Sequence, residues 1–304
     1  MKKLGFPNRI TVELTNVCNV SCTFCPRQSL HMEMGYMDME LYHKIIDEAS
    51  EHLPVKLVFF FRGESLLHPD FMELLKYAKD RGIGPIQFAT NAYAMSEKIS
   101  KKLVESGIDF ISFSLDTLNP EIYRQTRENG NLDVSMYNVR YLSRLCKERR
   151  KNGLKVPVLQ VSTIEIDEYM EGQKDFIEYW KQYVDIVRVY YEHDDKGKFR
   201  NTDVQKYVER EVAERKPCRK VFTDMLIYWD GQLALCNYDW RGELKGLNVH
   251  HMTLKEAWDS PIYEGIRKMH LEGELSETLM CKGCEHWRID YMPEGYLGKS
   301  YKGL

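Results

Sequence analysis

Three cysteines near the start of the chain constrain its fold and its chemistry more than any other feature. Cys18, Cys22 and Cys25 are spaced C-x3-C-x2-C and follow a short apolar run. Three thiolates on one loop can hold three irons of a [4Fe–4S] cube, and the fourth iron is then open to a small molecule. Buried unliganded cysteines and a zinc site are the alternatives, although zinc takes four ligands and this loop provides three.

The composition is that of a globular protein with metal-binding cysteines. The 304 residues are enough for one large domain, or for a large and a small one. The eight cysteines are clustered, which indicates metal ligation in a reducing compartment. The net charge of -3 counts against nucleic acid as a partner. With no run of about 18 apolar residues and no signal peptide, we expect no membrane partner and a cytoplasmic location.

Apolar periodicity predicts alternating strands and helices over the first two thirds of the chain. The expected strands are residues 9–14, 55–61, 86–90, 110–115, 156–166 and 186–191. The expected helices are residues 38–52, 69–80, 96–106, 120–128, 134–151 and 172–183. Six strand-then-helix units predict an α/β fold with a parallel sheet, and six are too few for an eight-stranded barrel. A curved, open, partial (β/α)6 TIM-like barrel fits this pattern.

The last third of the chain has a different character. Residues 193–215 are highly charged, which is typical of a solvated linker and a surface helix. We therefore expect two domains, a barrel over residues 1–200 and a small unit over residues 201–304. Within the small unit, the Asp-Gly pair at 230–231 lies between two apolar runs and predicts a hairpin over residues 221–236.

A helix is expected over residues 254–270. Thr253 is its predicted N-cap, and Glu256 stands at the third helical position, as a capping box requires. The hairpin and this helix are the two elements that we expect to form the small C-terminal domain.

Polar side chains stand at the carboxyl ends of the predicted strands, where parallel sheets place their ligands. They form successive groups: Arg62, Gly63 and Glu64; Thr90 and Asn91; Ser114 and Asp116; Gln160 and Ser162; Arg188, Tyr190 and Glu192. Each group could equally consist of polar caps on strand ends. Together they predict a ligand site at one edge of the sheet.

A second group of cysteines lies in the small domain. Cys218 and Cys236 are followed, 44 residues on, by Cys281 and Cys284. Two well-separated pairs can fully ligate one metal site, and a structural zinc ribbon is one interpretation. Cys146 is left over on a predicted helix, where we expect a core residue.

These motifs resemble a known family. The cysteine loop, with Phe24 before Cys25, resembles the radical S-adenosylmethionine (SAM) superfamily. The spacing C-x9-15-G-x4-C, which Cys218 begins, resembles the auxiliary-cluster domain of that superfamily, called SPASM or, when short, twitch. The resemblance implies the partial barrel, SAM and two [4Fe–4S] clusters. It makes Cys18, Cys22 and Cys25 the catalytic cluster ligands, and it assigns the second cluster to Cys218, Cys236, Cys281 and Cys284.

The resemblance also implies which residues bind SAM. Phe24 is expected near the adenine, and Gly63 and Glu64 near the amino group. Ribose and carboxylate contacts are expected from the following residues: Asn91, Ser114, Asp116 and Ser162. Arg62 departs from the Gly-Gly-Glu pattern of the family, and it could face the SAM carboxylate or a substrate.

The order of the four distal cysteines resembles the radical SAM dehydrogenases that oxidise an aminocyclitol. This implies oxidation of a secondary alcohol on a small cyclitol, aminosugar or sugar, with an electron donor such as flavodoxin or ferredoxin. An epimerase, for which Cys146 would be a hydrogen donor, and a peptide-modifying maturase are alternatives. A zinc-stabilised binding protein without redox chemistry is an alternative from another class.

Overall fold

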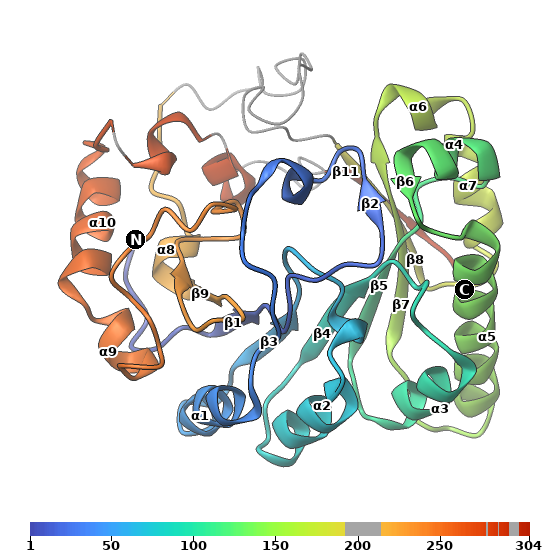
Figure 1. The fold of residues 1–304 in the computed structure, drawn as a ribbon, viewed down its shortest axis with the longest axis horizontal. Coiled ribbons are helices and arrows are strands. Elements are labelled where there is room, and N and C mark those ends of the chain that lie inside the picture. The colour runs from blue at the N-terminus through green and yellow to red at the C-terminus, as the bar shows by residue number, and fades with distance from the viewer. Residues whose placement is uncertain (192–213, 278, 285, 292–297) are drawn as a thin grey trace.

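One main sheet of nine strands runs through the described part of the chain. The computed structural model describes residues 1–191, 214–277, 279–284, 286–291 and 298–304. Within these residues the main sheet has the strand order β10-β9-β1-β3-β4-β5-β7-β8-β11 (Figure 1). The expected boundary at residue 200 and nearly all of the charged segment 193–215 lie outside the described residues.

The six expected strands are all present and pair in parallel in the expected order. Their bounds are Arg9–Val12 (β1), Lys56–Phe59 (β3), Ile86–Thr90 (β4), Phe110–Ser114 (β5), Val158–Glu165 (β7) and Ile186–Tyr191 (β8). The α/β fold with its mostly parallel sheet is therefore confirmed. The strand expected to reach Phe61 ends at Phe59, because Phe61 leaves the sheet and packs against Tyr228 and Trp240.

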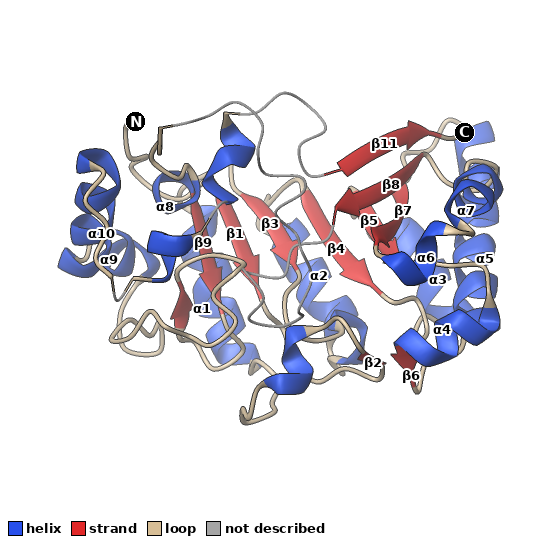
Figure 2. Ribbon diagram, turned by 90° about the horizontal axis from the view of Figure 1, so that it is seen from above, coloured by secondary structure: helices blue, strands red, loops and turns tan. Residues whose placement is uncertain are grey.

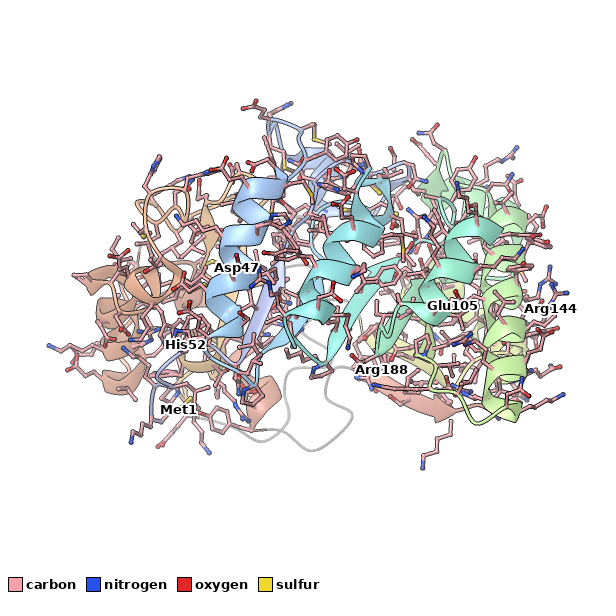
Figure 3. The ribbon with its side chains drawn as sticks, turned by 90° about the horizontal axis from the view of Figure 1, so that it is seen from below. Met1, Asp47, His52, Glu105, Arg144 and Arg188 are labelled. Atoms are coloured by element: carbon pink, nitrogen blue, oxygen red, sulfur yellow. The ribbon has the colours of Figure 1, made fainter. Side chains whose placement is uncertain are left out.

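Helices cover the outer face of the parallel strands (Figures 2 and 3). They are α1 (Met39–Ser50), α2 (Phe71–Asp80), α3 (Glu97–Glu105), α4 (Pro120–Thr126), α5 (Leu132–Lys151), α6 (Asp167–Met170) and α7 (Gln173–Trp180). Asp38 and Ser96 cap α1 and α3 by accepting the backbone N–H groups of Leu41 and Ile99. The buried faces of these helices join the helix-facing apolar residues of the strands in one large core.

The helix expected over residues 120–128 is shorter than predicted. It ends at Thr126, and Arg127–Glu128 forms a two-residue strand, β6, antiparallel to β2 (Ser21–Cys22). The pairing brings the chain after α4 against the cysteine loop. Helical periodicity alone gives no sign of this long-range contact.

The predicted hairpin is present, but it belongs to the main sheet. β9 (Asp224–Ile227) pairs antiparallel with β10 (Leu233–Ala234), and Gly231 takes a left-handed φ of 79° in the turn. β9 also pairs in parallel with β1. The small C-terminal unit is therefore joined to the barrel through a shared sheet.

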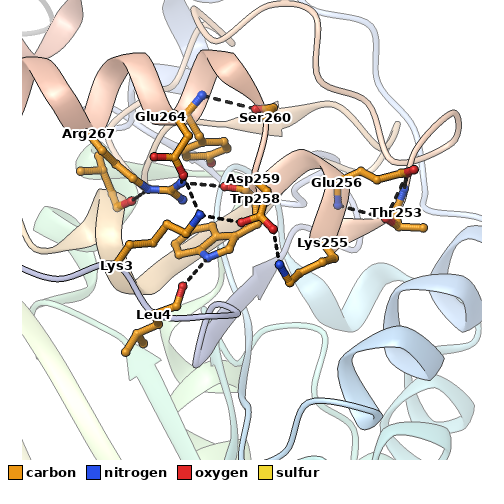
Figure 4. Close-up of polar contacts among 12 residues, drawn as sticks. Lys3, Leu4, Thr253, Lys255, Glu256, Trp258, Asp259, Ser260, Glu264 and Arg267 are labelled. Atoms are coloured by element: carbon orange, nitrogen blue, oxygen red, sulfur yellow. Dashed lines mark hydrogen bonds and ion pairs between the residues drawn. The ribbon is translucent and has the colours of Figure 1, made fainter.

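The predicted helix over residues 254–270 is broken into α9 (Leu254–Trp258) and α10 (Pro261–Glu272). The capping box of Thr253 and Glu256 is confirmed (Figure 4). Ser260 caps the second helix, and Pro261 occupies its first turn, where a missing N–H costs nothing. Sequence analysis missed this break, although Ser260 followed by Pro261 is a signal for the start of a helix.

A buried arginine holds these helices to the start of the chain (Figure 4). The guanidinium of Arg267 lies 4.1 Å from the Trp258 ring centre and donates to the carbonyls of Val221, at 2.9 Å, and Trp258, at 2.6 Å. The indole N–H of Trp258 donates to the Leu4 carbonyl at 2.9 Å. α8 (Lys220–Thr223), α9 and the N-terminal segment are thus packed as one unit.

The other edge of the sheet is closed by a strand that the sequence does not predict. β11 (Gly298–Lys302) pairs antiparallel with β8. A Cβ at Gly298 would lie 1.8 Å from the Val189 carbonyl oxygen, so only glycine allows this approach. No helix among the described residues is long and apolar enough to cross a membrane.

Candidate functional site

Hydrogen bonds of the Asn16 side chain help to hold the cysteine loop in place. Asn16 is fully buried and exchanges hydrogen bonds with Gly35 and Glu33, at 2.9 and 2.7 Å. Cys22 lies in β2, and the N–H of Cys25 donates to the Cys22 carbonyl at 3.1 Å. All three cysteines line one cavity of about 640 Å³. The structure therefore brings Cys18, Cys22 and Cys25 together at the carboxyl edge of the sheet.

The environment of these thiols disfavours free thiolates. Burial raises the pKa of Cys22 to about 12, although the nearby Arg127 cation opposes the shift. Burial also raises the pKa of Cys18 and Cys25. Thiols of this kind ionise when a metal binds them, because the coordinated cation replaces the proton.

The corner after β3 explains both Gly63 and Glu64. A Cβ on Gly63 would lie 2.2 Å from the Thr15 carbonyl oxygen, so a side chain here would push the cysteine loop away. The Glu64 carboxylate is buried and accepts the N–H groups of Leu66, at 3.1 Å, and Asn91, at 2.8 Å. Burial raises its pKa despite these donors. Both residues line the cavity, and each Glu64 oxygen retains acceptor capacity for a ligand.

Asp116 and Arg127 form a buried ion pair beside the cysteines. Arg127 Nε donates to Asp116 Oδ2 at 2.6 Å, and the Asp116 backbone has a left-handed φ of 65°. Burial raises the pKa of Asp116, and Arg127 opposes that shift. The same guanidinium lies 5.4 Å from the Phe24 ring centre. Asp116 thus positions Arg127 and Phe24 at the cavity wall in addition to facing the cavity itself.

The other expected strand-end residues divide between the cavity and its surroundings. Those that line it are Thr90, Asn91, Ser114, Gln160, Ser162 and Tyr190. Asn91 also places its side-chain nitrogen 3.9 Å from Cys18 Sγ. Arg188 is not among the lining residues and donates to Ser300 on β11 at 2.6 Å. Glu192 lies outside the described residues.

Arg62 is held by a partner that the sequence does not reveal. Its Nε and Nη2 atoms each donate to a carboxylate oxygen of Glu13 at 2.7 Å, and Glu13 is fully buried. Its guanidinium lies 3.7 Å from the Tyr228 ring centre and donates to the Trp240 carbonyl at 3.3 Å. Most of its donors are therefore used within the protein, which disfavours the expectation that Arg62 mainly faces a ligand.

The four distal cysteines are brought to a second cavity by three different segments. Cys218 precedes α8, Cys236 follows β10, Cys281 lies in the 3-10 turn Met280–Gly283, and Cys284 follows it. All four line this cavity together with His270. Burial raises the pKa of Cys281 to about 12 and that of Cys218 to about 11.

Both cysteine sets fit iron–sulfur clusters. Among the described residues, no three metal-binding side chains converge as tightly as the ligands of one metal ion do. A cubane places its irons at separate corners, so its cysteines need to surround a cavity rather than meet at one atom. Three cysteines in one cavity and four in the other match a cluster with one open iron and a cluster that is fully ligated.

Some cavity residues were missed by sequence reasoning. Arg9, Gln87, Ser112 and Trp240 line the main cavity, as does Arg127. Ser112 stands two residues before Ser114, and Gln87 stands four residues before Asn91, so strand alternation could have found both. Arg127 and Trp240 come from segments whose contact with the cavity depends on the tertiary fold.

Comparison with protein families identifies two parts of the chain. The model of the radical SAM superfamily matches residues 12–170, more than half of the chain. The model of SPASM, an iron–sulfur cluster-binding domain, matches residues 218–285. The two matches contain the three-cysteine loop and the four distal cysteines, respectively.

Individual relatives match over less than half of the chain. A tungsten-containing aldehyde ferredoxin oxidoreductase cofactor-modifying protein of Pyrococcus furiosus is 35% identical over 108 residues, which cover 35% of this chain and 30% of that protein. A probable GTP 3′,8-cyclase of Methanococcus maripaludis is 33% identical over 123 residues, which cover 40% of this chain and 41% of that protein. Mycofactocin maturase MftC of Mycolicibacterium smegmatis is 31% identical over 140 residues, which cover 46% of this chain and 35% of that protein. The chain thus matches less than half of the length of these relatives.

Solved structures share the fold over most of the chain. Streptococcus suis SuiB bound to S-adenosylmethionine superposes with a TM-score of 0.69 at 18% identity, over 88% of this chain and 69% of that one. BtrN in complex with S-adenosylmethionine and 2-DOIA superposes with a TM-score of 0.60 at 19% identity, over 90% of this chain and 89% of that one.

The fold, the two cysteine cavities and the family matches agree. They imply SAM and two [4Fe–4S] clusters as the cofactors. The chain belongs to the radical SAM superfamily and carries a C-terminal SPASM iron–sulfur domain.

Proposed function

We propose that this enzyme oxidises a secondary alcohol of a small polyol-like substrate, such as a cyclitol, an aminosugar or a sugar. When bound, SAM and the clusters supply a 5′-deoxyadenosyl radical that takes a hydrogen atom from the substrate and an acceptor for the electron then released. The observation that carries the proposal is the pairing of a three-cysteine cavity with a second, fully ligating four-cysteine cavity on one sheet. A fully ligated cluster has no open iron, so it suits electron transfer better than substrate binding.

The residues of the main cavity divide into roles in this proposal. Cys18, Cys22 and Cys25 hold the first cluster, and Glu64 accepts the SAM amino group on its remaining lone pairs. Phe24, stiffened by Arg127, packs on the adenine. Gly63 also has a second role, because its lack of a side chain lets the cysteine loop lie close to the corner after β3.

Three strand-end residues complete the SAM site in the proposal. Asn91 and Ser114 face the cavity close to the cysteine loop, and Ser162 faces it from β7. Asp116 contributes mainly through the ion pair that positions Arg127. Cys218, Cys236, Cys281 and Cys284 hold the second cluster.

The remaining cavity wall suits a hydroxylated ring. Gln160 Nε2 donates to Ser112 Oγ at 2.9 Å and lies 3.5 Å from Tyr190 Oη, and these three groups come from three neighbouring strands. Phe61 and Trp240 form an apolar wall, with ring centres 4.9 Å apart. Alternating apolar surface and fixed hydrogen-bonding groups is how proteins commonly recognise small polar ligands.

Of the two alternative reactions, one has some support and the other is disfavoured. Peptide modification is supported by the match to mycofactocin maturase and by the fold shared with SuiB, which has been crystallised with its precursor peptide. Epimerisation with Cys146 as hydrogen donor is disfavoured, because Cys146 is 1% exposed, belongs to the apolar core and does not line the cavity. An external donor such as flavodoxin or ferredoxin would reduce the first cluster in every case.

Replacing Cys18, Cys22 and Cys25 together by alanine tests the cluster assignments. The reconstituted parent should hold about eight irons per chain, four in each cubane, and the triple variant about four. The triple variant should also form no 5′-deoxyadenosine from SAM and a reductant. Iron content and nucleoside formation are measured anaerobically.

The matched control replaces Cys281 and Cys284 by alanine. This variant should likewise hold about four irons, now those of the first cluster, and still release 5′-deoxyadenosine. Nucleoside formation by the triple variant, or zinc in place of iron at the distal site, would contradict the assignment.

Product analysis tests the reaction itself. The reduced holoenzyme is incubated with SAM and a panel of cyclitols, aminosugars and sugars. We expect a ketone lacking two hydrogen atoms, formed together with one 5′-deoxyadenosine, and we expect Cys146→Ala to leave this activity unchanged. A product that has unchanged mass in ordinary water and gains one deuterium atom in heavy water would indicate epimerisation, and turnover restricted to peptides would favour the maturase.

A further inference from the structure

The deep end of the main cavity carries a cation that the proposed function does not use. Arg9 is the first residue of β1 and lines the cavity. Ile10 and Val12 face the core beneath the helices, so Arg9 and Glu13 share the opposite, inner face of the strand. Arg9 is thus about 13 Å along the strand from the level of Glu13 and the cysteine loop.

Arg9 has no partner among the described residues. Its Nε atom is buried without a hydrogen bond, and its side chain forms no hydrogen bond or ion pair in that part of the chain. A buried donor left unpaired costs about 1–3 kcal/mol, so such a group in a native protein calls for an explanation. A ligand acceptor in the cavity would provide one.

The charges beside Arg9 leave this corner positive. In the strand register Arg9 lies between Lys56 of β3 and Asp224 of β9. Asp224 is already engaged, because it accepts the Thr223 hydroxyl at 2.7 Å and lies 3.8 Å from Lys220 Nζ. The Arg9 cation therefore faces the cavity with a second cation next to it and without a carboxylate of its own.

We propose that Arg9 binds an anionic group of the substrate, a carboxylate or a phosphate. The substrate is then an acidic or phosphorylated polyol rather than a neutral or amino one. This inference rests on the proposed function, because it uses the same cavity. A guanidinium matches the two oxygens of such a group bidentately, and Gln160, Ser112 and Tyr190, which line the same cavity, would bind the hydroxyl groups of the substrate.

Binding measurements on the SAM-loaded holoenzyme test the proposal without turnover. The probes are glucose, glucosamine, glucuronate and glucose 6-phosphate, and the readout is the dissociation constant from anaerobic calorimetry. At least one anionic probe should bind the parent about tenfold or more tightly than glucose, and Arg9→Gln should remove that advantage. The anionic probe that binds more tightly shows whether a carboxylate or a phosphate is recognised.

Arg81→Gln is the matched control, because Arg81 forms a surface ion pair with Asp47 and does not line the cavity. It should leave all four affinities unchanged, and the iron content of both variants should equal that of the parent. The proposal is overturned if neither anionic probe binds more tightly than glucose, or if Arg9→Gln keeps the preference. The proposed function would fail separately, through the absence of 5′-deoxyadenosine or of a ketone product.

A different observation supports a second inference at the four-cysteine cavity. Nδ1 of His270, on α10, accepts the Cys218 N–H at 3.3 Å, so its ring hydrogen is on Nε2. That Nε2 is buried and has no hydrogen-bond partner among the described residues. His270 lines the same cavity as the four cysteines. An oriented donor therefore faces the space that these cysteines surround.

We infer that the His270 Nε2–H group donates to a sulfur atom of the second cluster and raises the reduction potential of that cluster. Hydrogen bonds to sulfur stabilise the more negative, reduced state of a cluster. The inference rests on the proposed cysteine ligation, and it makes His270 a positioning and tuning residue rather than a catalytic one.

Redox titration followed by electron paramagnetic resonance tests this role. His270→Phe, which keeps a ring but removes the donor, should lower the midpoint potential of the second cluster. His270→Gln, which keeps an N–H donor, should remain closer to the parent, and the first cluster should not change in either variant. Unchanged second-cluster potentials, or equal shifts in both clusters, would overturn the inference. If His270→Phe loses the second cluster, His270→Asn takes its place, because its shorter amide cannot reach a cluster sulfur. An unchanged second-cluster potential in His270→Asn would then overturn the inference.

Discussion

The buried ion pair between Glu13 and Arg62 links the segments that build both cysteine sites. Glu13 stands between β1 and the three-cysteine loop, and Arg62 directly precedes Gly63 and Glu64. The guanidinium then stacks on Tyr228 and donates to the Trp240 carbonyl, both of which belong to the C-terminal unit. A buried pair with two donors on one carboxylate is costly to break, because either partner alone would be an uncompensated buried charge. The pair thus fixes three chain segments at the mouth of the main cavity.

The position of β1 in the sheet also links the barrel to the C-terminal unit. β1 pairs with β3 on one side and β9 on the other, so the barrel and the C-terminal hairpin share one backbone hydrogen-bond network. Cys18 follows β1, and Cys218 and Cys236 flank the β9–β10 hairpin. The two cysteine cavities are therefore held by neighbouring strands rather than by separate domains. For a protein in which one cluster is to start a reaction and the other to accept an electron, such a fixed arrangement is suitable.

The local parts of this structure could be predicted from the sequence, and the non-local ones could not. The signal lies within a few residues for strands β1, β3, β4, β5, β7 and β8, for the caps at Ser96 and Thr253, and for the Asp-Gly turn. The pairing of β9 with β1 joins residues more than 200 positions apart, and no periodicity encodes it. The same is true of β2 with β6, where two residues on each side are enough because Arg127 is anchored on Asp116.

The candidate site divides in the same way. Cysteine spacing and strand-end polarity pointed to about half of the cavity lining, whereas the roles of Arg62 and Asp116 changed once their buried partners were known. Arg9 and His270 carry no motif, and they stand out only because buried nitrogen atoms lack partners.

The central claim is that one cavity holds a cluster with an open iron and the other a fully ligated cluster. Electron paramagnetic resonance of the reduced parent, recorded before and after addition of SAM, tests this most directly. The account predicts two [4Fe–4S] signals, of which SAM shifts one and leaves the other unchanged. A spectrum in which SAM shifts both signals, or neither, would contradict it.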